Sequence, residues 1–294
     1  MRYSLKQLAV FDAIAETKSV SLAAEKLALT QSATSMSLGQ LEKNLSKTLF
    51  DRQGKQMSLT YWGEWLLPRA KRLLQDAQQI EAGFTSLDTF SGEIRLCASQ
   101  TPAEHFIPRL ISELNAHYPN IHTQFRVKSS HEVIDALLDY QIDLGIIEGQ
   151  CSNSKIQQCT WQSDELVLVV SQSHPLAEKR KVTYNDLNLC KWVMREKGSG
   201  TRTVFDAVTK RYMPNINVVS EFDFVPVIKR LVIDNEYVTC LPRLDVADEL
   251  RLGSLVELRV EGLDLTRQLS FVWRANVADN PLITCVIDHA LAQN

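Results

Sequence analysis

The sequence predicts an α/β protein that carries a small helical module at its N-terminus. Three observations lead to this fold class. Residues 5–45 show helical apolar stripes, residues 66–87 repeat apolar positions in alternating steps of four and three, and strand and helix patterns alternate from Glu93 onward. Such alternation is typical of α/β domains with mostly parallel sheets. The 294 residues are enough for about two domains.

The composition is that of a folded protein. Hydrophobic residues make up 45% of the chain and charged residues 23%, with a net charge of −3, which excludes a mostly disordered chain. No apolar run approaches the roughly 18 residues that span a bilayer. The N-terminus mixes charges among its apolar positions, unlike a signal peptide. We therefore expect a cytoplasmic protein with no membrane partner.

Charge is unevenly distributed along the chain. Residues 1–70 hold nine Lys/Arg against six Asp/Glu, a net charge of +3, whereas the 204 residues from position 91 onward carry −5. A slightly acidic protein taken whole argues against a nucleic-acid partner. A basic head on an acidic body instead suggests two separate functions.

The head reads as three helices and a hairpin. The expected helices are residues 5–15, residues 22–27 capped by Ser21, and residues 31–45 capped by Thr30. The next segment, LFDRQGKQMSLT, predicts a short β-hairpin around Gly54. The second and third helices together have the outline of a helix–turn–helix, whose second helix enters the major groove of DNA.

Polar residues on this head are the candidate DNA contacts. The third helix has a small polar N-terminal face, which allows close approach to base edges and phosphates. The hairpin tip adds basic side chains that can reach adjacent phosphates. The predicted contacts with double-stranded DNA are Gln31, Ser32, Ser35, Met36, Arg52 and Lys55.

A long helix is expected to follow, capped by Thr60. Its apolar positions keep a 3.5-residue period over three heptads, the pattern of a coiled-coil seam. These positions are Leu66, Ala70, Leu73, Ala77, Ile80, Phe84 and Leu87. One helix cannot bury such a seam alone, so we expect a homodimer. The alternative is that the seam packs on its own chain.

Three turns between a strand and a helix are candidate anion sites, because helix N-termini present free N–H groups and a positive dipole end. Each also reads as a simple helix cap. Arg202 either supplies a countercharge or pairs with a surface carboxylate, and Glu148 either bonds the ligand or closes its strand. The predicted effector-binding residues are Ser99, Gln100, Thr101, Ser129, Ser130, Glu148, Gly200, Thr201 and Arg202.

The head resembles the N-terminal module of LysR-type transcriptional regulators. The matching pieces are Ser19-x-x-x-Ala23-Ala24-x-x-Leu27, Thr30-Gln31-Ser32-Ala33, Leu41-Glu42, Leu49-Phe50-x-Arg52 and Leu59-Thr60-x-x-Gly63. The resemblance implies a winged helix–turn–helix, a dimerising linker helix and a periplasmic-binding-protein-like (type 2) effector domain with a ligand cleft. The implied boundaries are 1–59, 60–90 and 91–294, with subdomain I about 91–161 and 267–294 and subdomain II about 162–266.

The resemblance also implies which partners the protein binds, and this sequence differs from the family's usual pattern at several positions. REKGSGTR is similar to a stretch in regulators of carbon fixation and sulfur assimilation, which implies a small anionic metabolite or oxyanion as effector, and dimers or dimers of dimers. Met36 and Gly39 stand where the family is commonly basic, and no positive charge occurs from Leu27 to Glu42. Phe222 stands where the family often has a Gly-rich turn. Its side chain would add bulk to the cleft, which favours a small ligand.

Other chemistries find little support in the sequence. P-loop, G-x-S-x-G and H-E-x-x-H motifs are absent, no C-x-x-C occurs, and no His pair at zinc spacing accompanies the cysteines. We therefore expect no enzyme activity, cofactor or metal site. Cys151 and Cys159 flank a polar stretch, which leaves a thiol-based redox-sensing regulator as the alternative function.

Overall fold

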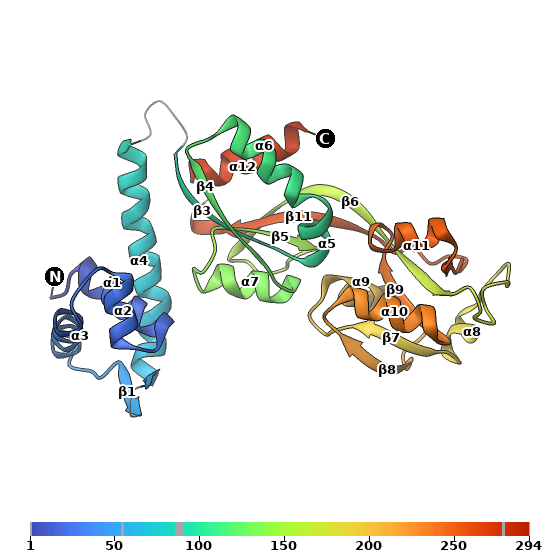
Figure 1. The fold of residues 1–294 in the computed structure, drawn as a ribbon, viewed down its shortest axis with the longest axis horizontal. Coiled ribbons are helices and arrows are strands. Elements are labelled where there is room, and N and C mark those ends of the chain that lie inside the picture. Colours follow the sequence, from blue (N-terminus) through green and yellow to red (C-terminus); the bar gives the residue numbers. More distant parts are fainter. Residues whose placement is uncertain (1, 54–55, 86–90, 278–279, 294) are drawn as a thin grey trace. The chain divides into compact units, whose positions relative to one another are not determined.

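The structure, a computed structural model, describes residues 2–53, 56–85, 91–277 and 280–293 (Figure 1). Contacts between Cα atoms divide the chain into two compact units. The N-terminal unit is Met1–Thr89 with Leu138–Tyr140, and the C-terminal unit is Phe90–Leu137 with Gln141–Asn294. Within the described ranges, no helix is both long and apolar enough to cross a membrane.

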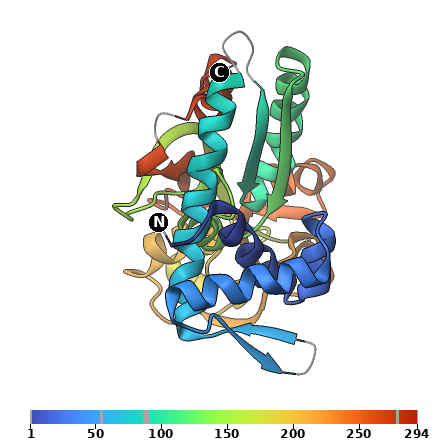
Figure 2. The same ribbon diagram turned by 90° about the vertical axis from the view of Figure 1, so that its left-hand side faces the viewer.

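The N-terminal unit consists of helices and one hairpin. Its elements are α1 (Leu5–Thr17), α2 (Val20–Lys26), α3 (Gln31–Leu45), β1 (Phe50–Gln53), β2 (Gln56–Leu59) and α4 (Tyr61–Thr85). Figure 2 shows the short helices gathered beside α4, with the hairpin extending away from them. Phe11, Ile14, Leu38 and Leu41 form the centre of its core. The expected helix–turn–helix and hairpin are confirmed at the level of these elements.

The helix caps explain one correction. Thr30 caps α3 as expected, because its hydroxyl accepts from the N–H of Ala33. The second helix begins at Val20, not at position 22, because Ser19 supplies the cap by accepting from the N–H of Leu22. Ser21 lies inside the helix and is exposed, so its prediction as the cap is wrong.

The predicted seam of α4 has two different environments. Thr60 caps the helix by accepting from the N–H of Gly63, and Ala70 is fully buried against the core of the same unit. Further along, the side chains of Leu73 and Ile80 are 43% and 64% exposed. The seam therefore packs on its own chain at its start and is uncovered later. The side chain of Phe84 and all of Leu87 lie outside the described residues.

A nine-stranded sheet forms the centre of the C-terminal unit. Its order is β4-β3-β5-β11-β6-β9-β7-β8, with β10 beside β6. The strands are β3 (Gly92–Ala98), β4 (Ile121–Val127), β5 (Leu144–Glu148), β6 (Ile156–Ser171), β7 (Lys191–Arg195), β8 (Asn217–Phe222), β9 (Tyr237–Pro242), β10 (Leu255–Glu257) and β11 (Thr266–Arg274). The outer strands pair in parallel, but β6 and β11 are antiparallel to their neighbours. The expectation of mostly parallel pairing is wrong for this middle part.

Helices cover the sheet in two halves, each with its own apolar core (Figure 1). The helices are α5 (Gln100–His105), α6 (Ile107–His117), α7 (Ser130–Leu138), α8 (Tyr184–Asn188), α9 (Gly200–Thr209), α10 (Val225–Asp234), α11 (Ala247–Leu252) and α12 (Pro281–Ala292), with 3-10 turns η1 (Leu244–Val246) and η2 (Ala275–Val277). The first half includes β3, β4 and β5, and the second half includes β7, β8 and β9. Strands β6 and β11 contribute to both.

One expected helix is divided in two. The sequence TPAEHFIPRLISELNAHYP predicts a single helix, but the structure ends α5 at His105 and begins α6 at Ile107. Phe106 between them departs from helical geometry, with φ −121° and ψ −40°. Pro108 has no N–H to donate and is favoured in a first helical turn, which explains a new start at this point.

The N-terminal unit depends on a glycine at the start of α4. A Cβ atom at Gly63 would lie 2.2 Å from the carbonyl oxygen of Leu49, so Gly63→Ala should lower the free energy of unfolding of this unit by about 1–3 kcal/mol. Gly39→Ala is the matched control, because nothing lies within 4 Å of the added atom and alanine favours a helix by about 1 kcal/mol. Differential scanning calorimetry measures both, and equal stabilities would contradict this account of Gly63.

Candidate functional site

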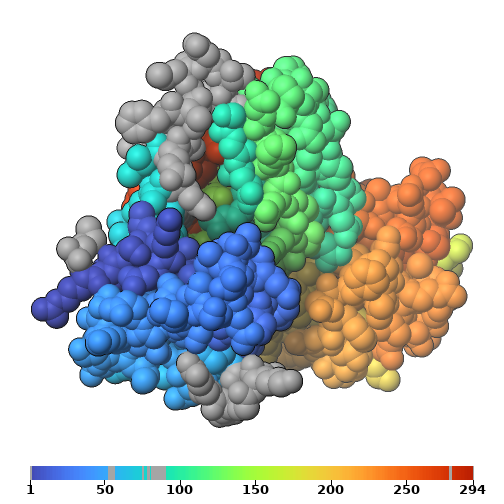
Figure 3. All heavy atoms as spheres, turned by 60° about the vertical axis from the view of Figure 1, so that its left-hand side comes forward, coloured from blue at the N-terminus to red at the C-terminus, as the bar shows by residue number. Residues whose placement is uncertain are grey.

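The first candidate site is the exposed face of α3. Gln31 and Ser32 are exposed and Ser35 is partly exposed, and the Met36 side chain is 75% exposed. The opposite face holds Thr34, Leu38 and Leu41, which are buried. In the space-filling view of Figure 3, the blue atoms of the N-terminal unit lie at the surface. The N-terminal part of the helix thus presents uncharged groups to solvent, as its sequence predicts.

The structure describes the two predicted basic contacts of the hairpin to different extents. Arg52 lies in β1, opposite Met57 of β2, and its side chain is outside the described part of the structure. Lys55 lies entirely outside the described residues. Their role at phosphates stays a prediction.

The second candidate site lies between the halves of the C-terminal unit and rests on a buried charge cluster of Arg267, Glu148 and Asp164. Arg267 and Asp164 are cross-strand partners on β11 and β6, and the Arg267 Nε donates to Asp164 Oδ2 at 2.7 Å. Its Nη1 donates to Glu148 Oε2 at 2.9 Å. All three side chains are at most 2% exposed. The sequence analysis did not single out Arg267 or Asp164.

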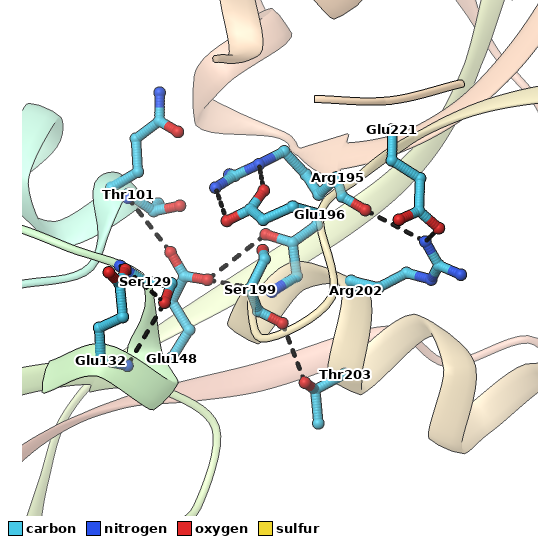
Figure 4. Close-up of polar contacts among 12 residues, drawn as sticks. Thr101, Ser129, Glu132, Glu148, Arg195, Glu196, Ser199, Arg202, Thr203 and Glu221 are labelled. Atoms are coloured by element: carbon cyan, nitrogen blue, oxygen red, sulfur yellow. Dashed lines mark hydrogen bonds and ion pairs between the residues drawn. The ribbon is translucent and has the colours of Figure 1, made fainter. Parts of the chain in front are cut away.

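The charge cluster is tied to one helix of each half. The backbone N–H of Thr101, in α5, donates to Glu148 Oε1 at 3.2 Å, and that of Thr201, in α9, donates to Oε2 at 3.0 Å. Arg267 donates in turn to both threonine hydroxyls at 2.9 Å. In Figure 4 the Glu148 carboxylate points toward Thr101. Glu148 is therefore an internal anion at the two helix N-termini.

This arrangement corrects part of the predicted anion site. The N–H groups of Thr101 and Thr201 were expected to be free for a ligand, but they are occupied by Glu148. Gly200 permits the close approach, because a Cβ atom there would lie 2.4 Å from the Glu148 Cβ. Burial alone would raise the pKa of Glu148, but Arg267, Arg195 and the hydrogen bonds from Thr101 hold it below its ordinary value. Glu148 is thus an ionised structural group.

Two other predicted groups also have protein partners. The hydroxyl and N–H of Ser129 both donate to Glu132 in the first turn of α7, and the Ser129 hydroxyl accepts from the N–H of Glu132. The Ser130 hydroxyl accepts from the N–H of Glu148. Arg202 is buried and forms ion pairs with Asp206 and Glu221 at 2.9 Å, as drawn for Glu221 in Figure 4. The Arg202 charge is therefore matched within the protein.

A cavity of about 440 Å³ lies beside these groups, between the two halves. Positive and negative side chains line it in equal number, and two predicted effector residues, Gln100 and Ser129, are among them. We call it the cleft pocket, and its lining is Gln100, Val127, Lys128, Ser129, His131, Glu132, Arg195, Glu196, Lys197, Gly198 and Asp223. The pocket is large enough for a small metabolite.

Three buried donors in or next to the segments that line the cleft pocket have no hydrogen-bond partner among the described residues. They are the hydroxyls of Ser99 and Ser199 and the Nη1 of Arg195. Arg195 lines the pocket, and Ser99 and Ser199 are sequence neighbours of its lining residues Gln100 and Gly198. Each serine is the N-cap residue of its helix, α5 or α9, yet makes no cap hydrogen bond. Arg195 uses its Nε and Nη2 on Glu196, at 2.9 and 3.0 Å. Buried donors without partners are uncommon, so these three mark the place where a ligand or water would bind.

Sequence reasoning found Ser99 but missed Ser199 and Arg195 as site residues. Ser199 follows Gly198 in the turn that opens α9, so its position in a strand-to-helix turn was a usable signal. Phe222 packs against the apolar core of the second half, and it does not line the cleft pocket. The expectation that it adds bulk to the cleft is therefore wrong.

The cysteines of the alternative hypothesis are both free and partly exposed. Cys159 lies in β6, and Cys151 lies in the loop before that strand. The N–H of Cys151 donates to the side chain of Gln158, and the Cys159 thiol faces the carbonyl oxygen of Thr160 at 3.6 Å. The redox alternative stays a prediction.

The charge cluster can be tested by removing its cation. Arg267→Met leaves Glu148 and Asp164 buried without a countercharge, so the free energy of unfolding of the C-terminal unit should fall by about 3–5 kcal/mol. Arg243→Met is the control, because Arg243 also bridges two carboxylates but its side chain is 40% exposed. That loss should stay below about 1 kcal/mol. Denaturant unfolding followed by circular dichroism compares them, and equal losses would contradict a structural role for the cluster.

Comparison with known proteins agrees with both units. The family described as "Bacterial regulatory helix-turn-helix protein, lysR family" matches residues 5–64, and the family described as "LysR substrate binding domain" matches residues 87–294. The uncharacterized HTH-type transcriptional regulator YeiE of Escherichia coli (strain K12) is 35% identical over 274 residues, which is 93% of this chain and 91% of that protein.

Two solved structures share the fold. Full-length CbnR complexed with its target DNA has a TM-score of 0.68 and 19% identity, over 99% of each chain. The regulatory domain of CcmR from Synechocystis PCC6803, in complex with 2-PG, has a TM-score of 0.63 and 24% identity, over 69% of this chain and 97% of that one. With two family matches that together span nearly the whole sequence, this chain belongs to the LysR family of DNA-binding transcriptional regulators.

Proposed function

We propose that this regulator binds promoter DNA through α3 and the hairpin, and that a small anion in the cleft pocket sets its DNA affinity. The observation that carries the proposal is the group of three buried donors, Ser99, Ser199 and Arg195, that have no partner in the described structure. They come from both halves of the C-terminal unit. One anion bound to all three would therefore stabilise a particular arrangement of the halves.

The DNA-binding part rests on the shape and chemistry of α3. Its exposed N-terminal face carries hydroxyl and amide groups, which bond to base edges and phosphates. The solved structure of CbnR with its target DNA has the same fold, which supports this placement by analogy. The exposed Leu73 and Ile80 on α4 further support a homodimer, in which a second copy covers the seam. Binding to promoter DNA places the protein in the cytoplasm.

The choice of an anion rests on the donors, because the charged residues that line the pocket balance. Lys128, Arg195 and Lys197 are offset by Glu132, Glu196 and Asp223. Two serine hydroxyls and a guanidinium N–H are instead free to donate. CcmR, whose regulatory domain was solved with 2-PG, is a relative in fold that supports a ligand of this class.

The DNA interface can be tested with a charge on α3. Ser32→Glu places a carboxylate on the exposed N-terminal face, where repulsion from phosphates should weaken binding to the promoter beside its own gene by at least about tenfold. Gln40→Glu is the control, because it adds the same charge to the exposed later part of α3. Fluorescence anisotropy at one fixed salt concentration measures both. Equal losses would contradict a face-specific contact.

The anion site can be tested by removing one free hydroxyl. We expect sulfate, phosphate or 2-PG to raise the melting temperature of the wild-type protein, whereas Ser199→Ala should weaken the binding of that anion about tenfold, the effect of losing one hydrogen bond to a charged group. Ser199 makes no cap bond, so the stability of the unliganded protein should change little. Thermal shift and isothermal titration calorimetry measure these quantities.

The control for this test is Ser220→Ala, which removes an exposed hydroxyl on β8 that bonds only to the neighbouring carbonyl oxygen of Val219. It should bind the anion as the wild type does. If none of the three anions shifts the melting temperature, or if both variants lose affinity equally, the proposed effector site is wrong.

A further inference from the structure

A second polar contact joins the halves of the C-terminal unit, away from the charge cluster. His105, the last residue of α5, places its Nε2 atom 2.6 Å from Oδ1 of Asp245, in the turn η1. Glu104 precedes His105, and one ligand atom from each of the three residues lies within 4.8 Å of the others. We call these three residues the His–carboxylate cluster. Glu104 and His105 belong to the first half and Asp245 to the second, and 140 positions of chain separate His105 from Asp245.

Asp245 is the unusual member of this cluster. Its side chain is only 1% exposed, and its second oxygen, Oδ2, is buried with no hydrogen-bond partner among the described residues. A buried carboxylate oxygen without a donor is costly, so it needs an explanation. An ordinary ion pair with His105 accounts for Oδ1 alone.

The neighbouring cation does not supply the missing partner. The ammonium of Lys229 donates to the backbone oxygen of Asp245 at 2.8 Å, not to its carboxylate. The same ammonium forms an ion pair with Glu249 at 2.7 Å. The charge of Lys229 is thus matched by Glu249, and its ammonium contacts Asp245 through the backbone oxygen.

We propose that Glu104, His105 and Asp245 bind a divalent transition-metal ion of the Zn²⁺ type. Imidazole nitrogens and carboxylate oxygens are both zinc ligands, and three protein ligands with water in the fourth position make a four-coordinate site. Mg²⁺ and Ca²⁺ prefer oxygen-only sets with more ligands. The ion would bind the unpartnered Oδ2 of Asp245. It would replace the direct contact between Asp245 and His105.

The geometry requires only small movements. Tetrahedral ligands about 2.0–2.2 Å from a zinc ion lie roughly 3.4 Å from one another. The present 2.6 Å contact between His105 and Asp245 would lengthen, and the most distant ligand atoms, within 4.8 Å, would approach. Glu104 and His105 are on the exposed side, so they can adjust. A bound ion would connect α5 to η1 and add a link between the halves that does not depend on the cleft pocket.

The test uses the full-length protein after removal of metals with a chelator. Zn²⁺ is titrated in competition with a chromophoric chelator, and one ion should bind per chain. His105→Gln and Glu104→Gln should each weaken this binding by at least about tenfold, since loss of even an outer-shell partner has that effect. His122→Gln is the matched control, because His122 is an exposed histidine on β4 outside the cluster, and its affinity should equal that of the wild type.

A second measurement separates this site from the six cysteines of the chain. Co²⁺ bound at the cluster should show ligand-field bands without a thiolate charge-transfer band. Melting curves of Glu104→Gln and His122→Gln without metal should match that of the wild type, because both side chains are exposed. A thiolate band, no bound Zn²⁺ in the wild type, or equal binding in His105→Gln and the wild type would each overturn the proposal.

Discussion

The ionic contact of Arg267 with Glu148 and Asp164 is the interaction on which the C-terminal unit depends. Burying three charges costs several kcal/mol each, and the cost is offset only when every group finds a partner in good geometry. Arg267 meets this demand because β6 and β11 place Asp164 opposite it, and because β5 ends at Glu148 beside them. The two threonines at the helix N-termini add hydrogen bonds to Glu148 and Arg267, whereas Oδ1 of Asp164 has no partner among the described residues.

Such a cluster fixes the relative position of the elements that it joins more than it adds to the free energy of unfolding. An apolar replacement of similar volume is often as stable, but it does not require one unique geometry. Here Glu148 and Arg267 have partners in α5, α9 and the central strands, so any relative shift of the halves separates charges in a medium of low dielectric. The halves are therefore coupled through a few exact hydrogen bonds. The anion that we propose at the neighbouring serines would act on a contact between the halves whose geometry is already restricted.

Local patterns made the elements predictable, and long-range pairing did not. The cap at Thr30, the hairpin and the strand-to-helix turns depend on neighbouring residues, so the sequence predicts them well. Arg267 lies within an ordinary strand pattern and meets Glu148 over 119 positions of chain, which no spacing rule reveals. The same reason explains why Glu148 was expected near a ligand when it occupies the helix N-termini itself, and why His105 and Asp245 gave no metal-site signal.

The uncharged face of α3 has a consequence for how the protein finds its sites. Non-specific affinity for DNA comes mainly from cations that displace counterions from phosphates. A helix with no Lys or Arg between Leu27 and Glu42 adds little to that background, while the hydroxyl and amide groups of the proposed DNA-binding face can still bond to base edges. The genome as a whole then competes less strongly for this helix. Discrimination is obtained by lowering the affinity for wrong sequences, not by raising the affinity for the right one.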